Sequence, residues 1–188
     1  MSAIICGVDE AGRGPLAGPV VAAAVILPES FLIAGLDDSK KLTEKRRDAL
    51  YSAIIEHATA YGIGTATAEE IDAHNILNAT YLAMNRAIAA LDITPDLCLI
   101  DGNRATGVTY PNECIVGGDG IVPCIQAASV LAKVHRDRLM TALDATYPNH
   151  GFVRHKGYPT KAHYDALDAH GETPIHRATF LRKWKAGR

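Results

Sequence analysis

Three short apolar runs, far apart in the sequence, each end in acidic residues. The runs span residues 4–8, 97–100 and 113–116, and the acids that follow them are Asp9 with Glu10, Asp101 and Asp119. Apolar runs of this length, bounded by turn residues, are typical of buried strands. If the three strands are neighbours and share a direction, their ends meet at one edge of a sheet, where open α/β sheets bind ligands. The pattern therefore predicts a sheet that gathers four carboxylates.

Further strands and helices alternate along the chain. Residues 19–27 are expected to pair with the first run as a long-looped hairpin, and residues 61–66 form another expected strand. Helical spacing and capping residues predict helices over 43–57, 75–91, 123–146 and 160–171. This order predicts an α/β fold with a mixed sheet. The 188 residues are expected to form one domain, with a small helical C-terminal region from about residue 148.

The composition of the chain excludes few functions, but it limits where in the cell the protein is expected. No apolar run approaches the roughly 18 residues that a membrane span needs, and the start of the chain lacks a secretory signal. A soluble cytoplasmic protein is expected.

The four cysteines show no Cys-x-x-Cys pairing, so buried free thiols are favoured over a disulfide or a zinc site. The formal net charge of −2 gives no global indication of nucleic-acid binding.

The gathered acids suggest a metal site. Four adjacent carboxylates repel one another unless they are protonated or bridged by cations. Hard divalent ions such as Mg²⁺ or Mn²⁺ prefer oxygen ligands, and two such ions about 4 Å apart can promote phosphodiester hydrolysis. Acids at strand ends are also common as helix caps and turn formers, so the spacing alone leaves both interpretations open.

A glycine-flanked arginine follows the first acidic pair. Gly12 and Gly14 would let the backbone approach a ligand closely while Arg13 contacts a phosphate. A plain turn is the alternative. The segment is not a Walker A loop, because no Gly-Lys-Ser/Thr follows.

Five ordered segments resemble bacterial ribonuclease HII, the type 2 ribonuclease H. Residues 7–21 resemble the opening signature of that family, and residues 38–42 its DSKKL segment. Residues 100–104, 127–137 and 155–160 resemble its IDGN segment, its AAS-ILAKV-RD helix and its HKGYPT turn. The resemblance covers nearly the whole chain.

The resemblance implies a ribonuclease H-like fold, a five-stranded mixed sheet flanked by helices. It also implies cleavage of RNA in RNA–DNA hybrids and incision 5′ of ribonucleotides embedded in duplex DNA, leaving 3′-hydroxyl and 5′-phosphate ends. The chemistry would use divalent ions, Mn²⁺ or Mg²⁺. The family's metal-binding catalytic acids correspond to Asp9, Glu10, Asp101 and Asp119.

The resemblance also implies substrate contacts. Gly12, Arg13 and Gly14 would contact the 2′-hydroxyl and the backbone at the RNA–DNA junction, and Tyr158 would stack on the next sugar. Lys40 and Lys41 fall in a segment near the substrate backbone. The family usually has lysine where Gly117 stands. The glycine would leave this chain without one of the family's phosphate contacts. A monomer is expected, and the C-terminus shows no clear sliding-clamp-binding peptide.

Two other functions remain open at this point. One is a metal-dependent nuclease of the same fold without a ribonucleotide requirement, which the Gly-Arg-Gly segment and Tyr158 argue against. The other is a non-catalytic nucleic-acid-binding module, which the complete set of acids argues against.

Overall fold

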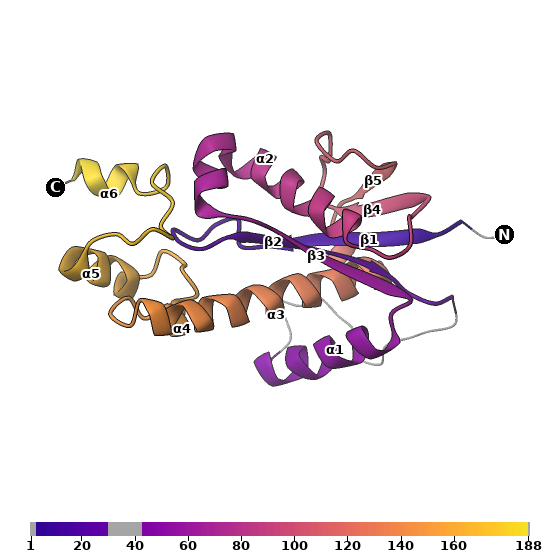
Figure 1. Ribbon diagram of the computed structural model, residues 1–188, viewed down its shortest axis with the longest axis horizontal. Coiled ribbons are helices and arrows are strands. Elements are labelled where there is room, and N and C mark those ends of the chain that lie inside the picture. The colour runs from indigo at the N-terminus through magenta and orange to yellow at the C-terminus, as the bar shows by residue number, and fades with distance from the viewer. Residues whose placement is uncertain (1–2, 30–42, 188) are drawn as a thin grey trace.

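The computed structural model describes residues 3–29 and 43–187, and a five-stranded mixed sheet lies at its centre (Figure 1). The strands are β1 (Ile5–Ala11), β2 (Val20–Ile26), β3 (Ala60–Ala66), β4 (Leu97–Asp101) and β5 (Asn112–Ile115), in the order β3-β2-β1-β4-β5. The β1–β2 and β2–β3 pairs are antiparallel, whereas β4 runs parallel to both β1 and β5. The mixed α/β sheet predicted from the sequence is therefore confirmed.

Helices cover both faces of this sheet (Figure 1). They are α1 (Glu44–His57), α2 (Ala68–Ala89), the 3₁₀ helix η1 (Gly118–Gly120), α3 (Pro123–Thr146), α4 (Phe152–His155), α5 (Lys161–His170) and α6 (Arg182–Ala186). α2 packs on one face, and α1 and α3 pack on the other. α4, α5 and α6 gather at one end, as the predicted helical C-terminal region. Within residues 3–29 and 43–187, no helix is long and apolar enough to cross a membrane.

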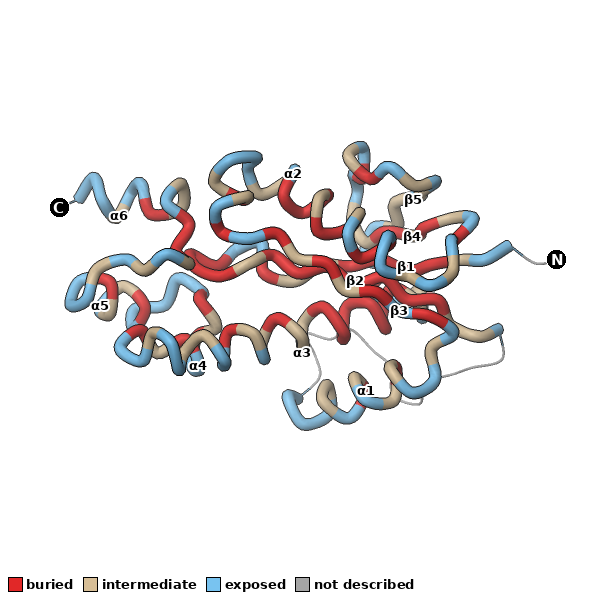
Figure 2. Tube along the Cα trace, in the orientation of Figure 1, coloured by how far each residue is buried: buried red, intermediate tan, exposed pale blue. Residues whose placement is uncertain are grey.

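β2 shows why the sheet is covered on both sides. Every residue of this strand is buried (Figure 2). Ala22 and Ala24 belong to the core beneath α2, whereas Ala23 and Val25 belong to the core beneath α1 and α3. Because side chains alternate between the two faces of a strand, a continuous apolar run can bury both faces. The four cysteines are free thiols, as predicted, but only Cys6 and Cys98 are buried, whereas Cys114 and Cys124 are partly exposed.

α2 begins seven residues earlier than the apolar spacing predicts. Thr67 and Glu70 form a capping box, in which each side chain accepts a hydrogen bond from the other's backbone amide. Asn75 then interrupts the helix with φ 66° and ψ 164°, and its Oδ1 accepts from the amides of Leu77 and Asn78. The predicted start was therefore wrong because Asn75 caps only the second half of a kinked helix.

β1 also differs from the predicted boundaries, since it continues through the acidic pair to Ala11. Asp9 lies opposite Ala23, and Glu10 lies opposite Ala22. Strand alternation therefore directs Asp9 toward the α3 side of the sheet and Glu10 toward the other side. The alternation of side chains along the strand therefore directs these two neighbouring acids to opposite faces of the sheet.

Candidate active site

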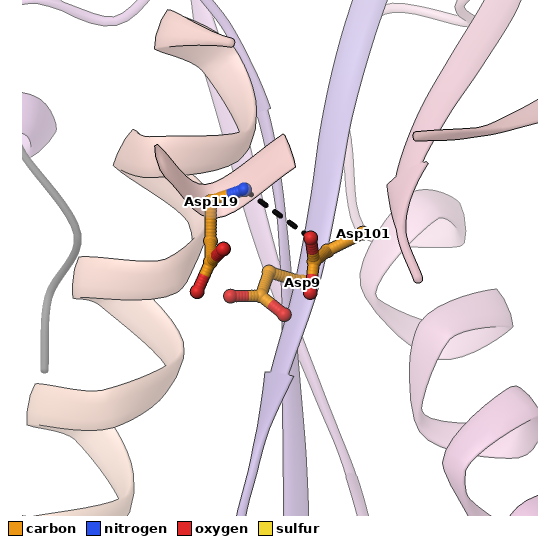
Figure 3. Close-up of side chains that lie close together, drawn as sticks. All are labelled: Asp9, Asp101 and Asp119. Carbon is orange, nitrogen blue, oxygen red and sulfur yellow. Dashed lines mark hydrogen bonds between the residues drawn. The ribbon is translucent and has the colours of Figure 1, made fainter. Parts of the chain in front are cut away.

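Three carboxylates converge at the junction of β1, β4 and η1. One oxygen atom of each of Asp9, Asp101 and Asp119 lies within 4.8 Å of the others. Figure 3 shows the three side chains turned toward one another, with the Asp119 amide donating to Asp101 Oδ1 at 3.2 Å. Asp101 ends β4, as predicted, whereas Asp119 lies in η1 beyond the end of β5. The parallel β1–β4 pairing brings the first two acids together, and η1 supplies the third.

The environment of Asp9 disfavours a negative charge. Burial raises the pKa of its carboxyl well above the ordinary value, and the charges of Glu10 and Asp101 raise it further. Hydrogen bonds from Ser129 and from the Glu10 amide act in the opposite direction. A divalent cation would relieve this repulsion, so the residues present fit a metal site.

Glu10 lies beside this group rather than within it. Its carboxylate forms an ion pair with Arg13, with Oε1 and Nη1 3.3 Å apart. The Asp9, Asp101 and Asp119 cluster accordingly does not include it. Gly117, which stands at the family's usual lysine position, adopts a left-handed conformation with φ 69° directly before η1. Glycine adopts this conformation at little cost, so it suits the turn that presents Asp119.

A cleft of about 260 Å³ adjoins the carboxylates. Its lining includes seven of the residues predicted from the sequence: Asp9, Glu10, Gly12, Arg13, Gly14, Asp101 and Tyr158. Tyr158 is partly exposed, and a Cβ added to Gly14 would lie 3.9 Å from its ring carbon Cε1. The Gly-Arg-Gly segment and Tyr158 therefore form adjacent walls of one cleft. Lys40 and Lys41 lie outside the described residues.

α3 contributes two cleft residues that the sequence analysis did not single out. Ser129 contacts Asp9, and Lys133 lies one turn further along the same helix face. Lys133 Nζ pairs with Asp137 at 2.7 Å and lies 5.9 Å from the centre of the Tyr158 ring. Within the apolar stretch 127–134 of α3, the polar residues are Ser129 and Lys133, and their spacing of four is the signal that would have identified this face.

A chain of hydrogen bonds between neutral histidines supports the Tyr158 turn. The Thr173 amide donates to His176 Nδ1 at 2.8 Å, so His176 carries its proton on Nε2. That proton points to His163 Nε2, 3.0 Å away, and His163 Nδ1–H therefore donates to the Tyr158 carbonyl at 3.0 Å. Burial lowers the pKa of both imidazoles to about 4. Adding a proton to either ring would place two donors face to face.

We expect acid to destabilise the protein through this pair. In the unfolded chain, the imidazoles of His163 and His176 bind protons at about pH 6.5. In the folded protein, the same two imidazoles stay neutral down to about pH 4. The unfolded state therefore binds more protons in that window, and the free energy of unfolding falls as the pH drops from 6.5 to 4. Urea denaturation at several pH values should show this slope, and His163→Gln should reduce it. The exposed His74→Gln variant is the control, and an equal slope in all three proteins would contradict the assignment.

Comparisons with known proteins place this chain in a family. The family model described as Ribonuclease HII matches residues 6–184. A ribonuclease HII of Dechloromonas aromatica (strain RCB) is 58% identical over 177 residues, covering 94% of this chain and 90% of that protein.

Solved structures share the fold. The crystal structure of ribonuclease H2 from Pyrococcus horikoshii OT3 superposes with a TM-score of 0.77 and 29% identity, covering 93% of this chain and 92% of that chain. The crystal structure of Bst-RNase HIII in complex with Mn²⁺ gives a TM-score of 0.76 at 20% identity, covering 98% of this chain and 69% of that chain. Since the family model matches nearly all of the sequence, the chain belongs to the ribonuclease HII family, endoribonucleases that cleave the RNA strand of RNA–DNA hybrids.

Proposed function

We propose that the protein also incises duplex DNA on the 5′ side of embedded ribonucleotides, leaving 3′-hydroxyl and 5′-phosphate ends. The observation that carries this proposal is a cleft whose lining joins Asp9, Glu10 and Asp101 to the Gly12–Gly14 segment and Tyr158. A centre for phosphodiester chemistry thus lies beside backbone groups that can read one nucleotide.

Asp9, Asp101 and Asp119 are the proposed ligands of two divalent ions, with Glu10 completing the set. Two ions there would activate water for attack on the phosphorus and stabilise the leaving oxygen. Oxygen ligands suit Mg²⁺ and Mn²⁺ equally in kind, and the similar RNase HIII structure contains Mn²⁺. The buried Asp9 carboxyl, whose pKa is raised by its surroundings, supports a cation at this place.

Recognition is assigned to the two cleft walls formed by the Gly-Arg-Gly segment and by Tyr158. The 2′-hydroxyl is the group that distinguishes RNA from DNA, and it can both donate and accept a hydrogen bond. In this proposal the Gly12–Gly14 backbone reads that hydroxyl, and Tyr158 packs against the following deoxyribose. Lys133, beside the Tyr158 ring, supplies a positive charge for a nearby phosphate.

The test uses a labelled DNA duplex that contains one ribonucleotide. We expect incision 5′ of that nucleotide with Mn²⁺ or Mg²⁺, at least about 10³-fold faster than any cut in the all-DNA duplex, because a site that bonds a hydroxyl rejects substrates lacking it. A chelator should abolish the reaction, and end-group mapping should find a 3′-hydroxyl.

The alternatives give different results in the same experiment. Comparable cutting of the all-DNA duplex would indicate a nuclease without a ribonucleotide requirement. Binding without cleavage in either metal, including no cleavage of a long RNA–DNA hybrid, would indicate a non-catalytic binding module.

A further inference from the structure

A buried arginine from the C-terminal region donates hydrogen bonds to the backbone carbonyls of the Gly-Arg-Gly segment. The Arg177 side chain is fully buried, and its partner carbonyls lie more than 150 residues earlier in the chain. Nη2 donates to the Gly12 carbonyl at 2.6 Å, Nη1 to the Arg13 carbonyl at 2.8 Å, and Nε to the Gly18 carbonyl at 3.0 Å. Among the described residues, every hydrogen bond of this guanidinium goes to a backbone carbonyl.

A second buried arginine ties the same loop to the Tyr158 turn. Arg136 donates to the carbonyls of Ala17, Pro19 and Lys156, at 2.9–3.1 Å. Its guanidinium carbon lies 5.8 Å from the centre of the Tyr158 ring. A Cβ added to Gly12 would overlap the Arg136 side chain, so the loop packs directly on this guanidinium. The two arginines together hold both recognition walls in one arrangement.

The Arg177 bonds determine where two backbone amides point. In a trans peptide the carbonyl and the following N–H point in opposite directions, and the described chain contains no cis peptide. Because Arg177 binds the Gly12 and Arg13 carbonyls, the amides of Arg13 and Gly14 face away from it. No described residue accepts a hydrogen bond from either amide, and both residues line the cleft.

The charge of Arg177 adds to this effect. A donor with positive charge polarises the carbonyl it binds, and the polarised peptide unit then becomes a stronger donor at its N–H. Burial and the nearby Arg136 lower the pKa of Arg177 to about 9, so the guanidinium remains charged at neutral pH.

We propose that Arg177 is a positioning residue for ribonucleotide recognition, which holds the Arg13 and Gly14 amides ready for the 2′-hydroxyl. This inference rests on the proposed function, because it names the group that organises the same recognition wall. Lysine cannot replace arginine here, since one ammonium group cannot span three carbonyl oxygens in the geometry of the guanidinium fork.

The experiment compares Arg177→Lys with Arg182→Lys, an exposed control on α6, in an Asp9→Asn background and in metal-free buffer, so that the duplexes stay uncut during the measurement. Fluorescence anisotropy measures affinity for a duplex with one ribonucleotide and for the all-DNA duplex. We expect Arg177→Lys to lower the preference for the ribonucleotide duplex about tenfold, with unchanged affinity for all-DNA duplex. The control should keep the parent preference.

The possible results distinguish a failure of the Arg177 inference from a failure of the proposed function. An Asp9→Asn parent without any preference would overturn the proposed function, and this inference with it. A parent preference that survives in folded Arg177→Lys would overturn the inference alone. So would an equal loss of affinity for both duplexes, since that result indicates a general structural effect.

A second measurement does not depend on the folding of the Arg177 variant. In the Asp9→Asn protein, NMR hydrogen exchange should show the Arg13 and Gly14 amides protected by the ribonucleotide duplex and not by the all-DNA duplex. Equal protection by both duplexes, or by neither, would contradict the inference even if Arg177→Lys fails to fold.

Discussion

Replacement of Asp9 by asparagine is expected to reduce kcat by roughly 10³-fold or more, because a central metal ligand is lost. The same change should stabilise the metal-free protein at neutral pH. The pKa of the folded Asp9 is raised above that of the unfolded chain by burial and by Glu10. The folded state therefore binds more protons, and stability falls as the pH rises from about 4 through the folded pKa. The neutral amide removes this penalty.

Cleavage assays and urea denaturation with and without Mn²⁺ test both halves of this expectation. In metal-free buffer, the free energy of unfolding of Asp9→Asn should exceed that of the wild type by on the order of 1 kcal/mol. With Mn²⁺ this difference should disappear, because the metal stabilises the wild type in preference to the variant. Asp92→Asn, at an exposed loop position, is the matched control. Retained cleavage in Asp9→Asn would remove Asp9 from the catalytic centre. Lower metal-free stability would contradict the account of its burial.

Replacement of Gly7 by alanine is expected to lower the free energy of unfolding strongly. Gly7 lies in β1 directly beneath the start of α3, and an added Cβ would overlap the backbone of Cys124 and Ile125. Backbone atoms cannot rotate aside as a side chain can, so α3 must shift. Overpacking of this kind costs about 3 kcal/mol or more.

The shift should also reduce activity, because α3 carries Ser129 and Lys133 on the wall of the cleft. Urea denaturation gives the change in unfolding free energy, and the cleavage assay gives the change in rate. Gly187→Ala, at an exposed position directly after α6, should match the wild type in both. A Gly7→Ala protein with wild-type stability would mean that α3 does not approach β1 this closely.

Several features of the fold were predictable because their signals are local. The fully apolar β2 run, the Thr43 and Thr160 caps and the proline at the start of α3 each act within a few residues. The start of α2 had a local signal too, the Thr67–Glu70 capping box. Apolar spacing alone missed it, because the Asn75 kink interrupts the helical period.

Part of the candidate site was also predictable from local signals. Apolar runs that end in acid, together with the ordered motifs, are enough to identify Asp9, Asp101 and Asp119. The sequence placed Glu10 beside Asp9, yet strand parity directs the two side chains to opposite faces. Adjacency along the chain therefore does not by itself bring the two carboxylates together, and Glu10 as a fourth ligand stays a prediction.

The sequence by itself determined the elements, the family and the acids, since each depends on residues that are close along the chain. Only the tertiary structure decided the roles of Arg136 and Arg177. Their partners include backbone carbonyls 119 and 165 residues away, and a carbonyl is the same group in every residue. No local pattern can indicate which carbonyls such an arginine will bind, because that choice depends on how β1, α3 and the C-terminal region pack together.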